Sequence, residues 1–362
     1  MPLKTAAIIY GGKSTEHEIS IRSARNIFKA IDYQQYNPLL IAIAKDGKWY
    51  LKTKQELESE VVVQPNGNQL VLIPGASADK ISILVTNKSI GRIDVVFPIV
   101  HGTGGEDGSL QGILKTLNIA FVGPGIIGSA LCIDKDVAKR ILTESGIANS
   151  KFLSFRKSER DQISYEKAQT ILGLPLYIKP PNLGSSVGIS KVTTKSEFSN
   201  AIELALSFDR KVLIEENIVG REIECAVIGN NDVHASPVGE VVTIGENHTF
   251  YSYEAKYTDA NGSVTVIPAE MDSTTQDRIR DIAIKTYKAL NCEGMARVDV
   301  FLKDNGDIIV NEVNSLPGFT DISMYPQLWE AGGVSYTELI SKLLALAIER
   351  NIEDNKMLTS IE

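Results

Sequence analysis

The chain has 362 residues, enough for two or three domains with cores of their own. It is 43% hydrophobic and 23% charged, with a mean hydropathy of −0.03, as is typical of a soluble globular protein. The formal net charge of −8 argues against a general nucleic-acid-binding surface, which needs clustered lysine and arginine, but not against a bound nucleotide.

The N-terminal part predicts strands that alternate with helices. Thr5–Tyr10 and Leu39–Ala44 are predicted strands, and apolar residues at helical spacing predict a helix between them. A third strand is predicted at Asp94–Val100. This alternation indicates a parallel α/β layer, whereas the span from about 46 to 92 predicts only short β segments. The apolar run Ala6–Tyr10 is too short for a signal sequence or a membrane span, so we expect a cytoplasmic protein.

A glycine-rich segment, Gly123–Gly128, follows the strand predicted at Ile119–Val122 and reads G-x-G-x-x-G. One helix is predicted after it, through Asp134 and Lys135 to about Ser145. A nicotinamide-binding site would require a second strand with an acidic residue at its end. The nearest acid, Glu144, lies inside the predicted helix, which argues against a dehydrogenase.

The remaining elements are mainly short strands. The charged stretch Arg156–Asp161 predicts an exposed connection, and Ser273–Gln276 matches a capping box that would begin a helix. The polar loop at about Gly245–Val264 predicts a lid, because loops of this length are usually functional or disordered. The other predicted elements are a helix at Tyr165–Leu172, strands at Pro175–Lys179, Ile189–Val192, Val212–Glu216, Glu222–Gly229 and Val238–Ile244, and a final helix from near Tyr336.

The three cysteines, Cys132, Cys225 and Cys292, lie far apart in the sequence among apolar neighbours. Their spacing matches no metal-binding motif. We therefore expect reduced thiols in the core.

A β-hairpin near the C-terminus carries the clearest chemistry. Residues two apart on a strand face the same side, so Arg297 and Asp299 share a face, as do Glu312 and Asn314. The turn Asp304–Asp307 would pair the two strands. Asp299, Glu312 and Asn314 would then form a set of oxygen ligands for Mg²⁺, beside the positive charge of Arg297. An ordinary polar hairpin is the alternative.

Loops at strand ends and acids at a predicted junction supply further candidates. His101 directly follows a strand, and Glu16 lies in the loop after the first strand. A structural histidine and charge compensation at a helix N-terminus are the alternatives. Gly184–Gly188, after Lys179, could form an anion-binding turn of backbone amides. Glu215–Glu222 clusters acids that could accept from ribose hydroxyls, or could be a solvated edge.

Taken together and in this order, these segments resemble the D-alanine–D-alanine ligases of the ATP-grasp superfamily over nearly the whole chain. The matching stretches are Gly11–Ser20, His101–Gly112, Cys132–Lys135, Lys179–Gly188, Glu215–Glu222, Tyr251–Tyr257, Arg297–Asp299 and Glu312–Met324. The resemblance implies an α/β fold with three-domain ATP-grasp architecture. Its expected parts are a substrate-binding domain with a parallel sheet at 1–122, a central ATP-grasp domain at 123–216 and a catalytic ATP-grasp domain at 217–362.

The resemblance also implies the reaction. Two D-alanines would be joined to D-alanyl-D-alanine through an acyl phosphate formed from ATP, for peptidoglycan precursors and hence cell-wall biogenesis and cell shape. The expected cofactors are ATP and two Mg²⁺, with Mn²⁺ as a substitute for Mg²⁺. We expect a homodimer with D-alanine and ATP as ligands, and neither nucleic acid nor membrane as a partner.

Individual roles follow from the same resemblance. The expected catalytic residues are Glu16, Ser185, Tyr257, Arg297 and Gly318. Substrate would also contact His101, Ser323 and Met324. Nucleotide would be held by Lys135, Lys179, Ser186, Glu215, Glu216, Glu222, Phe250 and Lys256. The expected metal ligands are Asp299, Glu312 and Asn314.

Two positions depart from the family pattern, and other functions stay open. Ser252 stands where the lid often has aspartate, and Asn217 stands where an aromatic residue is common beside adenine. A ligase of the same fold could instead join D-alanine to D-lactate or D-serine. Lys256 and Tyr257 argue against D-lactate, but D-serine stays open. A catalytically inactive ATP-binding subunit conflicts with the complete set of metal ligands.

Overall fold

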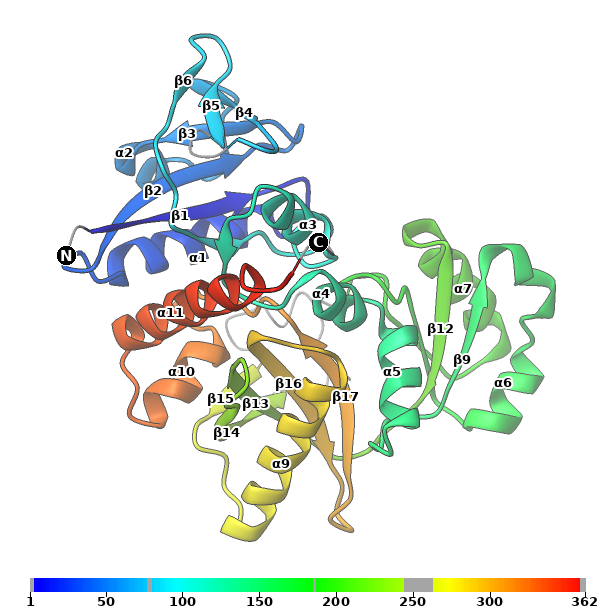
Figure 1. Cartoon of the computed structure of the whole chain (residues 1–362). Coiled ribbons are helices and arrows are strands. Elements are labelled where there is room, and N and C mark those ends of the chain that lie inside the picture. The colour runs from blue at the N-terminus through cyan, green and yellow to red at the C-terminus, as the bar shows by residue number, and fades with distance from the viewer. Residues whose placement is uncertain (1–2, 77–79, 185–186, 244–262, 359–362) are drawn as a thin grey trace.

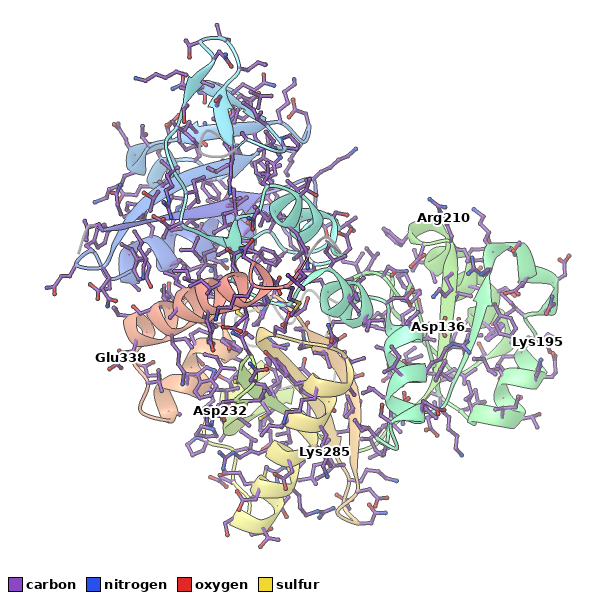
Figure 2. The ribbon with its side chains drawn as sticks, in the orientation of Figure 1. Asp136, Lys195, Arg210, Asp232, Lys285 and Glu338 are labelled. Atoms are coloured by element: carbon purple, nitrogen blue, oxygen red, sulfur yellow. The ribbon has the colours of Figure 1, made fainter. Side chains whose placement is uncertain are left out.

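The computed structural model describes residues 3–76, 80–184, 187–243 and 263–358. Within these ranges three β-sheets follow one another along the chain, with eight, four and five strands. Figure 1 shows the four-stranded sheet standing apart on one side, while the C-terminal helix lies between the other two sheets. Charged side chains such as Lys195, Lys285 and Glu338 lie on outer faces of these layers (Figure 2).

The eight-stranded sheet has the order β6-β5-β4-β3-β2-β1-β7-β8. Its strands are β1 (Lys4–Gly11), β2 (Tyr36–Ile43), β3 (Trp49–Lys52), β4 (Asn68–Leu72), β5 (Ile81–Ile83), β6 (Lys88–Ser89), β7 (Val95–Ile99) and β8 (Ala120–Phe121). β1 pairs in parallel with β2 and β7, and β7 pairs in parallel with β8, which confirms the predicted layer. The span 46–92 extends this sheet with antiparallel strands. The helices of this part are α1 (His17–Ala30), α2 (Lys54–Ser59) and α3 (Ser109–Thr116).

The four-stranded sheet is antiparallel and presents two different faces. Its strands are β9 (Phe152–Arg156), β10 (Leu176–Lys179), β11 (Ser190–Val192) and β12 (Lys211–Glu216), and its helices are α6 (Tyr165–Leu172) and α7 (Lys195–Phe208). Because side chains alternate along a strand, Leu176 and Ile178 pack in an apolar cluster with both helices. Tyr177 and Lys179 point to the opposite face. The predicted exposed connection is a 3₁₀ helix, Lys157–Gln162, none of whose residues is buried.

The five-stranded sheet contains the predicted hairpin. Its strands are β13 (Arg221–Gly229), β14 (His234–Thr243), β15 (Ser263–Val266), β16 (Gly294–Leu302) and β17 (Ile308–Asn314), covered on one side by α9 (Ser273–Ala289). β16 and β17 are antiparallel, with Arg297 opposite Asn314 and Asp299 opposite Glu312. The predicted sharing of a face is therefore confirmed. Ser263 and Val264, the end of the predicted lid, belong to β15 instead of a loop.

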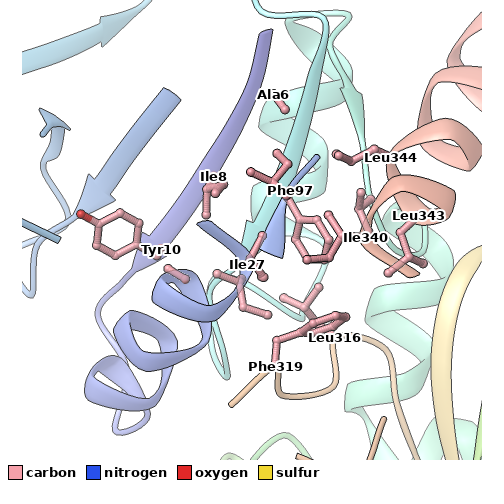
Figure 3. Packing of buried hydrophobic residues seen from close by; sticks show 14 of the residues in the cluster. Ala6, Ile8, Tyr10, Ile27, Phe97, Leu316, Phe319, Ile340, Leu343 and Leu344 are labelled. Carbon is pink, nitrogen blue, oxygen red and sulfur yellow. The ribbon is translucent and has the colours of Figure 1, made fainter. Parts of the chain in front are cut away.

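The last two helices are α10 (Met324–Ala331) and α11 (Tyr336–Asp354), and α11 completes the core of the first sheet. Figure 3 shows Ile340 and Leu344 of α11 beside Phe97 of β7. The ring of Phe97 meets that of Phe319 edge to face at 5.3 Å. The hydrophobic core thus crosses the boundary expected between the first and third domains, and those boundaries stay a prediction. Among the described residues, no single helix has the length and hydropathy needed to span a membrane. Helices α10 and α11, which are bent by 107° relative to each other, reach that length and hydropathy only when they are taken together.

The single helix predicted after the glycine-rich segment is wrong, because two helices occupy this stretch. α4 (Ile126–Ile133) ends and α5 (Lys135–Glu144) begins at Asp134, whose backbone is extended. The Asp134 carboxylate accepts from two backbone amides of α5 and caps it. A Cβ at Gly128 would lie 2.3 Å from the carbonyl oxygen of Asn291. This glycine therefore permits close packing of α4 on the turn between α9 and β16, which is a structural reason for the dinucleotide-like pattern.

Two further predictions at element ends had different outcomes. The capping box at Ser273–Gln276 is wrong: Asp272 is the N-cap of α9, and its carboxylate accepts from the Thr275 amide at 2.9 Å. Aspartate is as good a cap as serine and lies one position earlier. The cysteines are free and buried, as predicted. Although far apart in sequence, Cys132 and Cys292 have their sulfur atoms 3.4 Å apart.

Candidate functional site

Two adjoining cavities contain most of the predicted site residues. The larger of the two, of about 420 Å³, lies where α5 and the four-stranded sheet meet the hairpin of the five-stranded sheet. Its walls combine basic and acidic side chains with a few apolar ones. Predicted site residues among its lining are Lys135, Lys179, Glu215, Glu216, Glu222, Asp299 and Glu312. The structure therefore brings together, from six different elements, most of the groups predicted to hold nucleotide and metal.

Lysines on two sides of this cavity are buried and paired with carboxylates. Lys179 Nζ lies 2.7 Å from Glu215 Oε2, on the face of the four-stranded sheet that α6 and α7 leave uncovered. Lys135, in the first turn of α5, lies 3.2 Å from Glu312 Oε2 and donates to the carbonyl of Leu183. Buried cations of this kind suit the oxygens of a polyphosphate.

The edge of the larger cavity carries the remaining predicted acids. Glu216 accepts from the backbone amide of Lys151 at 2.7 Å, so its carboxylate helps to join β12 to β9. Burial raises the pKa of the Tyr177 phenol, and the nearby charge of Glu222, the second residue of β13, raises it further. Tyr177 is an aromatic lining residue that sequence reasoning missed. The period-two alternation that places Lys179 in the cavity also predicts Tyr177 there.

The hairpin residues form a charged network around Arg297. The guanidinium donates to both carboxylate oxygens of Asp299, at 2.7 Å each, and lies 2.8 Å from Glu224 Oε2. Asn314 donates to Asp299 at 2.9 Å. Burial alone would lower the pKa of Arg297, but the two carboxylates raise it well above its ordinary value. Arg297 is thus a permanent buried cation, held in place from two sides.

The donor chemistry of the hairpin fits a hard divalent cation. Asp299 and Glu312 face each other across the strands, and Asn314 adds an amide beside them. Among the residues that the structure describes, no cluster of three or more histidine, cysteine, aspartate or glutamate side chains could bind a metal by itself. A cation here would therefore need oxygens from a bound phosphate, as is usual for Mg²⁺.

The smaller cavity, of about 120 Å³, adjoins the larger one. Its lining brings together predicted residues from four separate segments of the chain: Glu16, His101, Arg297, Gly318, Ser323 and Met324. Glu224 and Glu312 line both cavities. Glu16, just before α1, makes no capping bond with that helix. The charge-compensation alternative thus lacks a capping contact, and Glu16 lines the cavity instead.

The loop between β17 and α10 packs tightly around Gly318. A Cβ at Gly318 would lie 2.7 Å from the hydroxyl of Ser323. That hydroxyl accepts from the backbone amide of Thr320 at 2.8 Å and contacts the Thr320 hydroxyl at the same distance. The loop therefore presents an ordered group of hydroxyls to the smaller cavity.

His101 and Glu106 form a buried pair in this cavity. His101 Nδ1 lies 3.4 Å from Glu106 Oε1, and its other ring nitrogen lies 3.4 Å from the Ser23 hydroxyl. Burial lowers the pKa of His101, but Glu106 and Glu16 outweigh this and raise it above the ordinary value. Burial raises the pKa of Glu106. Sequence reasoning missed Glu106, although it lies in the same loop as His101.

This pair predicts a specific pH dependence of stability. Because the folded state raises the pKa of His101, its stabilising contribution is complete below the unfolded pKa, near 6.5, and is lost as pH rises through the folded pKa. We expect the free energy of unfolding to fall as pH rises above about 6.5, and His101→Gln to flatten that fall. Urea unfolding of both proteins at a series of pH values measures it. An unchanged slope in the variant would contradict the coupling.

Five predicted site residues lie outside the described part of the chain: Ser185, Ser186, Phe250, Lys256 and Tyr257. The predicted lid likewise lies outside it, apart from its last two residues. Lys139 and Glu224, by contrast, are described and were missed from the sequence. Lys139 lies 3.0 Å from Glu215, and Glu224 lies between the two cavities.

Comparison with known proteins identifies the family. The model of the D-Ala–D-Ala ligase N-terminus matches residues 5–124, and that of the C-terminus matches residues 141–345. The chain belongs to the D-alanine–D-alanine ligase family. A D-alanine–D-alanine ligase of Oceanobacillus iheyensis is 49% identical over 99% of this chain and 98% of its own length. The predicted family and ATP-grasp fold are confirmed.

Two solved structures of this ligase family are informative. The VanG D-Ala:D-Ser ligase of Enterococcus faecalis has a TM-score of 0.84 and 36% identity, covering 96% of this chain and all of its own. A Bacillus anthracis D-alanine–D-alanine ligase complexed with ATP has a TM-score of 0.72 and 25% identity, covering 97% of this chain and 99% of its own. ATP is thus a ligand within the family.

Proposed function

We propose that this chain joins two D-alanine molecules to D-alanyl-D-alanine at the expense of ATP, releasing ADP and phosphate, for the supply of peptidoglycan precursors. The observation that carries the proposal is that a nucleotide-sized cavity and a smaller polar cavity share Glu224 and Glu312 in a member of this ligase family. A phosphate bound in the first cavity would therefore lie beside an amino acid bound in the second.

The reaction would proceed in two steps. A carboxylate oxygen of the first D-alanine attacks the γ-phosphorus of ATP, and ADP leaves with the electrons of the broken P–O bond. The deprotonated amine of the second D-alanine then attacks the carbonyl carbon of the acyl phosphate, and phosphate leaves. Positioning and charge neutralisation supply most of the catalysis in phosphoryl transfer, and the buried lysines and arginine of this site suit that task.

For the nucleotide we propose a specific set of contacts. Lys135 and Lys179 would neutralise phosphate oxygens, Glu222 would accept from the ribose hydroxyls, and Glu215 and Glu216 would border the adenine. Ser186, Phe250 and Lys256 would complete the site, with support from the family resemblance alone. Asp299, Glu312 and Asn314 would hold two Mg²⁺, or Mn²⁺ in their place. When bound, these ions would draw negative charge away from the transferred phosphoryl group.

For the amino acids we propose contacts in the smaller cavity. Glu16 would bind the ammonium of the first D-alanine, near His101. The backbone of Gly318 and the guanidinium of Arg297 would stabilise the oxyanion of the tetrahedral intermediate. Ser323 and Met324 would receive the carboxylate of the second D-alanine. Ser185 and Tyr257 would hydrogen-bond with Glu16, as the resemblance implies.

D-serine as second substrate is a further candidate, because a D-Ala:D-Ser ligase is 36% identical to this chain. The smaller cavity also contains the hydroxyl groups of Thr265 and Thr320, which could accept a serine side chain. A cytoplasmic location and a homodimer also belong to the proposal, and the latter has support only from the resemblance.

One assay tests the proposed function. Phosphate release from ATP is measured with D-alanine, D-serine and D-lactate, singly and in pairs, and the products are weighed by mass spectrometry. We expect D-alanyl-D-alanine to form from D-alanine alone. The absence of phosphate release with D-alanine would contradict the proposal, and a mixed D-Ala-D-Ser product at equal concentrations would favour the second candidate.

A further inference from the structure

A third buried lysine lies behind the larger cavity without lining it. Lys139 is on α5, one helical turn after Lys135, and only 1% of its surface is exposed. Lys139 does not line the cavity, so its ammonium would not contact a nucleotide bound there. Burying a lysine is costly unless its charge is paired. We therefore expect Lys139 to contact a carboxylate.

The partners of Lys139 are residues of the cavity wall. Its Nζ lies 2.7 Å from the hydroxyl of Ser150 and 3.0 Å from Glu215 Oε1. The other oxygen of Glu215 lies 2.7 Å from Lys179 Nζ. Two ammonium groups therefore share one carboxylate, and all three side chains are at most 8% exposed.

Of the three charged residues Lys139, Glu215 and Lys179, only the last two can contact a nucleotide in the larger cavity. Lys179 and Glu215 face the cavity, whereas Lys139 does not line it and contacts Glu215 and Ser150. A nucleotide phosphate competes with Glu215 for the ammonium of Lys179. If Lys179 were its only cation, Glu215 would become an uncompensated buried carboxylate on nucleotide binding, at a cost of several kcal/mol.

We propose that Lys139 is a positioning residue for nucleotide binding: it keeps the charge of Glu215 compensated, so that Lys179 can turn to a phosphate. This inference rests on the proposed function in so far as the ligand is a nucleotide. Burial raises the pKa of Glu215, but Lys139 and Lys179 lower it by more, so the carboxylate is ionised. Burial lowers the pKa of Lys139, and the charge of Glu215 opposes that shift.

The test is a double-mutant cycle on ADP binding, measured by calorimetry with Mg²⁺ and without D-alanine. Lys139→Met should weaken ADP binding at least ~10-fold, because hydrogen bonds to charged groups contribute about 1.5–3 kcal/mol. In the Glu215→Gln background, the same substitution should weaken it less than ~3-fold, since no carboxylate needs compensation. The KM for D-alanine should change less than about twofold.

A matched control is Arg140→Met, which removes a cation from the next residue of α5, where the side chain is 62% exposed. It should leave ADP binding unchanged. Equal effects of Lys139→Met in both backgrounds, or none in either, would overturn the proposal. If Lys139→Met does not fold, Lys139→Gln allows the same comparison. Because ADP binding is read without D-alanine, its outcome is separate from the D-alanine-dependent phosphate release that tests the proposed function.

Discussion

Glu312→Gln should lower turnover at least ~10²-fold, because metal ions supply several kcal/mol of transition-state stabilisation and Glu312 is one of the two carboxylates proposed to hold them. Glu312 faces Asp299 across the hairpin, lies 3.2 Å from Lys135 and lines both cavities. Glutamine keeps the size of the side chain but removes its charge. The measurement is D-alanine-dependent phosphate release over a range of Mg²⁺ concentrations.

The same hairpin offers a matched control for Glu312. Asp307→Asn removes a carboxylate at the turn, where Asp307 is exposed, lies 3.8 Å from Lys303 and accepts from the side chain of Asn305. Turnover of this variant should equal that of the wild type. Near-normal turnover of Glu312→Gln, with circular dichroism and thermal unfolding unchanged, would refute the metal assignment.

Replacement of Arg297 should affect both stability and catalysis. Arg297→Met leaves Asp299 and Glu224 buried without their shared cation, and loss of one partner of a buried pair costs about 3–5 kcal/mol of unfolding free energy. Arg297→Lys keeps a positive charge but loses the bidentate contact with Asp299. We expect it to fold and to lower kcat by ~10²–10³-fold, the usual loss for an oxyanion-stabilising donor.

Urea unfolding and steady-state kinetics of both variants separate these two effects. Arg221→Met is a suitable control, because Arg221 on the neighbouring strand pairs with Glu240 at a more exposed position that lines neither cavity. It should cost less than about 1 kcal/mol and leave kcat unchanged. A kcat within twofold of wild type in Arg297→Lys would remove Arg297 from the proposed oxyanion site.

Patterns of neighbouring residues predicted those elements whose structure depends on neighbouring residues. The hairpin of β16 and β17 follows from period-two alternation and a turn containing Asn-Gly, and both signals lie within eighteen residues. The break between α4 and α5 had a local signal that sequence reasoning missed, because Asp134 is a residue type that caps helix N-termini. The contact that accompanies the break, from the Lys135 amide to the Pro181 carbonyl, joins distant parts of the chain and has no local signal.

The candidate site shows the same limit. Glu16, His101 and the hairpin residues were recognisable because each lies in a motif with its own local signal. Lys139 has none: on the sequence it is one charged residue of an amphipathic helix, and only the tertiary structure brings Glu215 of β12 within 3.0 Å of it. Glu224 was hidden in a cluster of acids, since only its register opposite Asp299 turns it toward Arg297.

The packing of α11 against the first sheet has a consequence for synthesis on the ribosome. The sheet that contains β1 and β7 is translated first, but Ile340, Leu343 and Leu344, which complete its core, are translated almost last. At roughly 5–20 residues per second, the apolar surface awaiting α11 stays uncovered for tens of seconds. During that interval the nascent chain presents a hydrophobic face that chaperones can bind. The first part of this enzyme to be made is therefore among the last to finish folding.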